Sequence, residues 1–150
     1  MQQPPTGELA LVFTDIEGST ALWERLGDAF APVLEVHNRV MREALQAHGG
    51  YEVKTEGDAF VVAFPSADAA LGFCHRAQLQ LAETPWPAAL SPDTGTPPQL
   101  WVRMGMHVGA PVARPDPTHG RMDYFGPVVN RAARVAAAAH GGQILASGAA

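Results

Sequence analysis

Residues 11–28 read LVFTDIEGSTALWERLGD, an apolar run that turns abruptly into a short polar-capped segment. The run ends on a single acid, Asp15, and the small residues Gly18, Ser19 and Thr20 follow shortly after it. Such residues can begin a helix and leave its first backbone amides without partners. A carboxylate beside free amide donors indicates a site that holds a cation and a phosphate together. The rest of the chain must supply the partners of that site.

The bulk composition predicts one folded domain and excludes several classes of partner. The chain has 150 residues, 47% of them apolar and 17% charged, which is typical of a single globular domain. The formal net charge is -5 and the ten Lys and Arg residues form no run, so we expect no binding to a nucleic acid polymer. A small anion such as a nucleotide needs only a few local donors.

Cysteine content and hydropathy indicate the cellular compartment of the protein. Cys74 is the only cysteine, which excludes an internal disulfide and fits a reducing compartment. No run of eighteen apolar residues occurs, and residues 1–7 lack the pattern of a secretion signal. We therefore expect a soluble cytoplasmic protein without a membrane segment, with residues 1–7 as a flexible lead and residues 8–150 as the domain.

Hydrophobic spacing predicts alternating strands and helices, which favours an α+β sandwich with a mainly antiparallel sheet covered by helices. A tight turn at Glu56–Gly57 predicts a hairpin. Residues 84–98 contain five prolines and are expected to form a surface loop of unassigned function. The predicted strands are 8–14, 51–55, 58–64, 100–108, 111–114 and 143–146, and the predicted helices are 19–26, 32–48, 67–82 and 127–139.

A second acid, Asp58, begins the strand that follows the hairpin turn. If the first strand pairs beside this hairpin, Asp15 and Asp58 approach each other. Two carboxylates at adjacent strand ends can bridge two divalent ions about 4 Å apart, and oxygen ligands favour Mg²⁺ or Mn²⁺. On spacing alone, the simpler interpretation is that both acids cap turns at the edge of the sheet.

Four motifs together carry a family resemblance that the acids alone do not. They are FTDIEGST at 13–20, KTEGDAF at 54–60, VRMGMHVG at 102–109 and MDYFGPVVNRAAR at 122–134. In order and rough spacing they resemble the class III nucleotidyl cyclase catalytic domains, especially the bacterial homodimeric ones. The resemblance covers about residues 8–147. It implies a ferredoxin-like fold and an intracellular signalling reaction that converts ATP to 3′,5′-cyclic AMP and pyrophosphate.

The resemblance implies a role for individual residues. Asp15 and Asp58 fall on the positions that bind two divalent metal ions, Mg²⁺ or Mn²⁺, with the backbone carbonyl of Ile16 as a further ligand. Asn130 would orient the ribose and Arg134 would neutralise charge at the α phosphate. The backbone amides that would meet the β and γ phosphates are those of Glu17, Gly18, Ser19 and Thr20.

Lys54 and Asp123 fall on the two positions that select the base in this family. Adenine presents an acceptor at ring N1 and a donor amine at C6, which an ammonium and a carboxylate complement. Guanine reverses both groups, and mispaired buried groups discriminate strongly between substrates. Family members that use guanine carry Glu and a small residue at these positions, so the resemblance implies ATP.

The family builds each site from two protomers, the acids from one and the base-selecting and ribose-facing residues from the other. Because this chain carries both sets, the resemblance implies a homodimer with two composite sites. The family domain usually continues past the strand at 143–146 into a helix and a hairpin, which we expect this chain to lack. A regulatory domain outside these residues stays possible. Alternatives are a weakly active or inactive nucleotide-sensing or dimerisation module, or a guanylyl cyclase.

Overall fold

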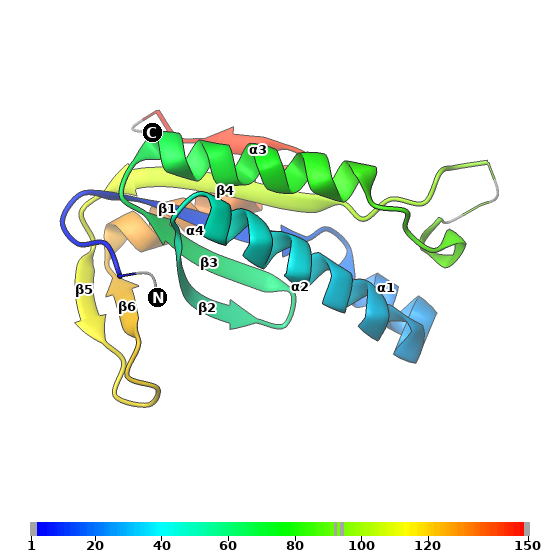
Figure 1. Cartoon of the computed structure of the whole chain (residues 1–150), viewed down its shortest axis with the longest axis horizontal. Helices are drawn as coiled ribbons and strands as arrows, with labels where there is room; N and C mark the ends of the chain where they lie inside the picture. Colours follow the sequence, from blue (N-terminus) through cyan, green and yellow to red (C-terminus); the bar gives the residue numbers. More distant parts are fainter. Residues whose placement is uncertain (1–2, 92, 94, 149–150) are drawn as a thin grey trace.

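The computed structural model describes residues 3–91, 93 and 95–148, and it confirms the predicted α+β class. A five-stranded sheet carries helices on both faces, and a separate two-stranded ribbon lies at one end (Figure 1). The strands are β1 (Leu9–Ile16), β2 (Tyr51–Glu56), β3 (Ala59–Phe64), β4 (Val102–Gly109), β5 (Val112–Pro115), β6 (Met122–Phe125) and β7 (Ile144–Ala146). The α-helices are α1 (Ser19–Leu26), α2 (Phe30–Ala47), α3 (Ala67–Glu83) and α4 (Pro127–Ala137).

The sheet has the order β2-β3-β1-β4-β7, so β1 lies at its centre. Neighbouring strands are antiparallel except for β4 and β7, which are parallel. In the register, Thr14 of β1 faces Phe60 of β3, and Asp15 faces Arg103 of β4. The β2–β3 turn therefore lies at the same end of the sheet as the end of β1.

Side chains alternate between two cores along β1, as the period of a strand requires. Ala10, Val12 and Ile16 join the core under α2 and α3. Leu9 and Leu11 pack on the other face, in the core that includes Ala132 of α4. A strand buried on both faces is mostly apolar, which is why residues 9–13 show no polar alternation.

Three boundaries differ from the sequence prediction and bear on the site. Strand β1 continues to Ile16, so Asp15 lies in the strand and not after it. The hairpin turn is at 57–58 and not at Glu56–Gly57, which places Asp58 in the turn. Strand β6 was not predicted, because a four-residue strand that pairs only with β5 has too short a pattern to be distinguished from a loop.

The proline-rich segment 84–98 is partly docked on the domain. Residues 88–90 form a single 3₁₀ turn, and the Trp86 and Leu90 side chains are buried. The Trp86 indole donates to the Leu81 carbonyl at 2.8 Å, and Arg25 of α1 donates to the Ala89 carbonyl at 2.7 Å. The described part of this segment is mostly exposed and is a surface loop as predicted, but the 3₁₀ turn and the burial of Trp86 and Leu90 were not predicted. Residues 92 and 94 lie outside the described residues.

The structure also bears on the predictions about the cysteine and about membrane segments. Cys74 is a buried free thiol, and burial raises its pKa to about 12. Within 3–91, 93 and 95–148, no helix combines the length and the apolar character that crossing a bilayer demands.

Helix α4 packs so closely on β4 that a side chain at Gly105 has no room. A Cβ there would lie 2.2 Å from the Ala136 nitrogen and 2.3 Å from its Cα. Because both are backbone atoms, we expect Gly105→Ala to push α4 away and to lower the free energy of unfolding by about 1–3 kcal/mol. Chemical denaturation measures this change, with Gly148→Ala as control, since a Cβ at Gly148 meets nothing within 4 Å. Equal stability of the two variants would contradict the close approach.

Candidate active site

The two acids predicted to bind metal lie at one end of the sheet, where β1 ends. Asp15 is the second-to-last residue of β1, and Asp58 lies in the turn between β2 and β3. The Ile16 amide donates to Asp58 Oδ2 at 2.7 Å, across 42 positions of sequence. The structure therefore brings the Asp58 carboxylate beside the residue that follows Asp15, as the pairing of β1 with β3 predicts.

Arg103 is a site residue that the sequence analysis missed. Its Nε donates to Asp15 Oδ1 at 2.8 Å and its terminal nitrogen donates to Asp15 Oδ2 at 2.7 Å. The hydrogen bond to Asp15 raises the pKa of Arg103, and the negative charges of Glu17 and Asp58 raise it further. The signal was available, because a lone charge between the apolar residues Val102 and Met104 of a strand requires a partner.

This end of the sheet suits a hard cation. The Asp15 carboxylate binds the Arg103 guanidinium directly, and the negative charges of Glu17 and Asp58 also stabilise it. A positive charge therefore already lies at this place. Among the residues described, no group of three or more His, Cys, Asp and Glu side chains is arranged to hold a metal alone. Two carboxylates with a backbone carbonyl and phosphate oxygens are the donors that Mg²⁺ and Mn²⁺ prefer. The residues present therefore fit the expected ions.

The turn before α1 leaves amides available for an anion. Gly18 has φ 70°, a left-handed conformation that glycine adopts without strain, and no side chain caps the helix. In the described part of the chain, no acceptor is recorded for the amides of Gly18, Ser19 and Thr20. The Glu17 amide differs, because it donates to the Trp101 carbonyl at 2.8 Å. Three of the four expected phosphate-binding amides are therefore open in this structure.

Glu17 has a second contact, which links the turn to the end of α4. Its carboxylate accepts a hydrogen bond from the Gly141 amide at 3.2 Å, and a Cβ at Gly141 would lie 2.7 Å from Glu17 Oε2. Gly141 follows α4 and precedes β7. This hydrogen bond thus connects the turn that follows Asp15 with the loop that follows α4 in the same subunit.

The two residues expected to select the base lie together. Lys54 Nζ of β2 is 3.7 Å from Asp123 Oδ2 of β6, and the Asp123 side chain is only 12% exposed. Asp123 Oδ1 also accepts a hydrogen bond from the Tyr124 amide at 2.7 Å, which fixes the carboxylate. The Lys54 side chain is 40% exposed, so the ammonium faces the surface of the domain.

Asn130 and Arg134 lie one turn apart on α4, and both are exposed while Ala132 between them is buried. Glycine at N-cap and Pro127 in the first turn begin this helix. Within the described residues, no recorded hydrogen bond or ion pair joins Asn130 or Arg134 to the acids or to Lys54 and Asp123. The structure therefore places the expected site residues in separate groups on one chain.

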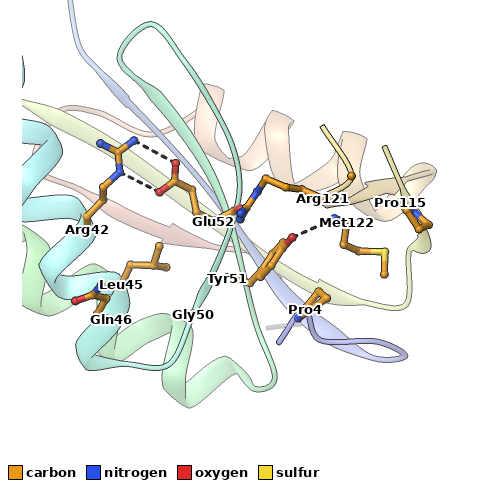
Figure 2. Close-up of a pocket in the computed structure, with 11 residues that line it drawn as sticks. Pro4, Arg42, Leu45, Gln46, Gly50, Tyr51, Glu52, Pro115, Arg121 and Met122 are labelled. Atoms are coloured by element: carbon orange, nitrogen blue, oxygen red, sulfur yellow. Dashed lines mark hydrogen bonds and ion pairs between the residues drawn. The ribbon is translucent and has the colours of Figure 1, made fainter. Parts of the chain in front are cut away.

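A cavity of about 580 Å³ lies beside the edge strand β2 (Figure 2). Its charged residues are already engaged with one another: Arg42 Nε is 3.0 Å from Glu52 Oε1, and Arg121 lies over the Tyr51 ring and donates to the Glu52 carbonyl. It contains no predicted site residue. A smaller cavity of about 250 Å³ adjoins the phosphate turn and is lined by Glu17, Gly18, Arg25, Leu90 and Trp101, among others.

The family model of the adenylate and guanylate cyclase catalytic domain matches residues 1–150, and the chain belongs to this family. It is 48% identical to an adenylate cyclase of Neurospora crassa over 96% of this chain and 7% of that protein. It is 51% identical to an adenylate cyclase of Mycosarcoma maydis over 96% of this chain and 6% of that protein. The chain spans between 6% and 9% of the length of the fungal relatives.

A solved structure gives the same assignment. A structure of adenylate cyclases from Trypanosoma brucei in their monomeric state superposes with a TM-score of 0.90 at 33% identity. It covers 99% of this chain and 76% of that one. The predicted nucleotidyl cyclase fold is thereby confirmed.

Proposed function

We propose that this chain is an adenylyl cyclase catalytic domain, which converts ATP to 3′,5′-cyclic AMP and pyrophosphate at the interface of a cytoplasmic homodimer. The observation that carries the choice of base is the ion pair between Lys54 and Asp123. The close relatives that are named adenylate cyclases support the same choice.

Asp15, Asp58 and the Ile16 carbonyl would hold two divalent ions, Mg²⁺ or Mn²⁺, at the end of β1. When bound, such ions lower the pKa of the ribose 3′ hydroxyl and stabilise charge on the phosphates. The amides of Gly18, Ser19 and Thr20 at the start of α1 would bind the β and γ phosphates, with the positive end of the helix dipole behind them.

The ribose and the reacting phosphorus would be held by α4 of the second copy. Asn130 would orient the ribose so that the 3′ oxygen lies in line with the leaving pyrophosphate, and Arg134 would stabilise charge at the α phosphate. Both side chains are exposed on one face of α4 and are free to reach a second chain. Most of the rate enhancement would come from positioning and charge neutralisation, since no side chain here is placed as a dedicated base.

Lys54 and Asp123 would recognise adenine by its N1 acceptor and its 6-amine donor. In the free domain the two groups neutralise each other across 3.7 Å. Adenine offers each of them a replacement partner, whereas guanine would set N–H against the ammonium and a carbonyl against the carboxylate. A buried pair of mismatches of this kind costs a factor of about 10⁴ in kcat/KM.

The test is to incubate the protein with Mn²⁺ and either ATP or GTP and to separate the products by chromatography. We expect cyclic AMP from ATP and far less cyclic GMP from GTP, and we expect Asp15→Asn to lower the rate by about 10²–10³ or more. Excess cyclic GMP would overturn the base assignment. A protein that binds ATP without turnover would be the nucleotide-sensing module instead.

A further inference from the structure

We propose that Arg103 is a positioning residue that keeps divalent ions off Asp15 until a nucleotide arrives. The inference rests on the proposed function and deepens it, because it states when the metal site becomes available. Its basis is that both carboxylate oxygens of Asp15 are already engaged, at 2.8 and 2.7 Å, by the Arg103 guanidinium.

The geometry of the pair is built into the sheet. Asp15 and Arg103 are direct cross-strand partners in β1 and β4, so the two side chains leave neighbouring strands on the same face. The guanidinium meets the carboxylate through two parallel hydrogen bonds, which is the strongest arrangement that these two groups form. Asp15 is 40% exposed and Arg103 is 30% exposed, so ions in solution can reach the pair.

The pairing of β1 with β4 does not depend on this ion pair. Strands β1 and β4 are already paired over the full length of β1, from Leu9 opposite Gly109 to Ile16 opposite Val102. The backbone register therefore needs no further connection at position 103. What the guanidinium does supply is a positive charge among the carboxylates of Asp15, Glu17 and Asp58.

Arg103 and a divalent ion compete for the same oxygens. An ion at Asp15 either displaces one of the two hydrogen bonds or binds the remaining lone pairs of the carboxylate. In both cases it lies within a few ångströms of the positive charge of Arg103. Without a nucleotide, only the negative charges of Glu17 and Asp58 offset that repulsion. A triphosphate adds negative charge at the adjoining turn and removes the penalty, so metal and nucleotide would bind together while metal alone would bind weakly.

Calorimetric titration with Mn²⁺ in the absence of nucleotide tests the proposal without any turnover. We expect Arg103→Gln to bind Mn²⁺ about tenfold more tightly than the wild type, because it removes the competing charge. Arg103→Lys keeps the charge with a single contact, and we expect a smaller gain. Arg76→Gln is the matched control, since Arg76 is exposed on α3, which covers the opposite face of the sheet. It should leave the affinity unchanged.

A double variant, Asp15→Asn with Arg103→Gln, identifies where the added affinity arises, and it should lose the whole gain. The proposal is wrong if neither Arg103 variant binds Mn²⁺ more tightly, or if Arg76→Gln gains as much. If the double variant binds Mn²⁺ as tightly as Arg103→Gln alone, the metal assignment in the proposed function falls, and this inference falls with it. Loss of metal binding in Asp15→Asn without a gain in Arg103→Gln overturns this inference alone.

Discussion

Mixing two inactive variants, Asp15→Asn and Arg134→Ala, is expected to restore about a quarter of the wild-type activity per subunit. If each site takes its acids from one copy and α4 from the other, the mixed dimer contains one doubly altered site and one intact site. Random reassortment makes about half of the dimers mixed, so about one site in four is intact. Each variant alone has no intact site and should be almost inactive.

The measurement is cyclic AMP formation after the two purified variants are mixed and equilibrated. The matched control is Asp15→Asn mixed with Asp58→Asn, since both changes fall on the acid side and every site of the mixed dimer then carries one altered acid. We expect no recovery in that control. Recovery in neither mixture would show that one chain holds a complete site, and equal recovery in both would show that the acids act from different copies.

Replacing Lys54 by Glu together with Asp123 by Ser is expected to shift the ratio of kcat/KM for ATP over GTP by about 10³–10⁴ towards GTP. The glutamate accepts from the guanine N–H, and the small hydroxyl donates to the carbonyl at C6. Lys54 and Asp123 neutralise each other at 3.7 Å. Lys54→Glu alone therefore sets two carboxylates against each other, and Asp123→Ser alone leaves the Lys54 ammonium without its partner. We therefore expect each single variant to lose ATP activity without gaining GTP activity.

Steady-state rates with both nucleotides measure this shift. Arg121→Glu serves as control, because Arg121 adjoins β6 but contacts Tyr51 and Glu52 and not Asp123. That variant should keep the preference for ATP. A double variant that still prefers ATP, while remaining folded by circular dichroism, would show that other groups read the base.

Much of the fold could be predicted because its signals are local. A continuous apolar run marks β1, a mostly apolar run marks β4, three-and-four spacing marks α2 and α3, and the glycine at position 57 marks the hairpin. The approach of Asp15 and Asp58 needed only one further assumption, that β1 pairs beside that hairpin, and the register bears it out. The α+β class then follows from the order of the elements.

The features that escaped prediction depend on contacts between distant segments. Residues Met122–Phe125 form strand β6 because they pair with β5. Four residues have too little periodicity for a strand to be predicted from the sequence. The contact of Arg103 with Asp15 depends on the register of β1 and β4, which places the two residues opposite each other. How two copies are arranged lies beyond one chain, so the roles of Asn130 and Arg134 stay predictions that the mixing experiment tests.

The hydrogen bond from the Gly141 amide to the Glu17 carboxylate has a consequence for kinetics. In a pair of subunits arranged as proposed, each subunit binds the triphosphate at one catalytic centre and contributes its α4 to the other centre. Glu17 ties those two halves of the subunit together. Binding of substrate at the first centre should then change the affinity of the second. The dependence of rate on ATP concentration should therefore depart from a simple hyperbola.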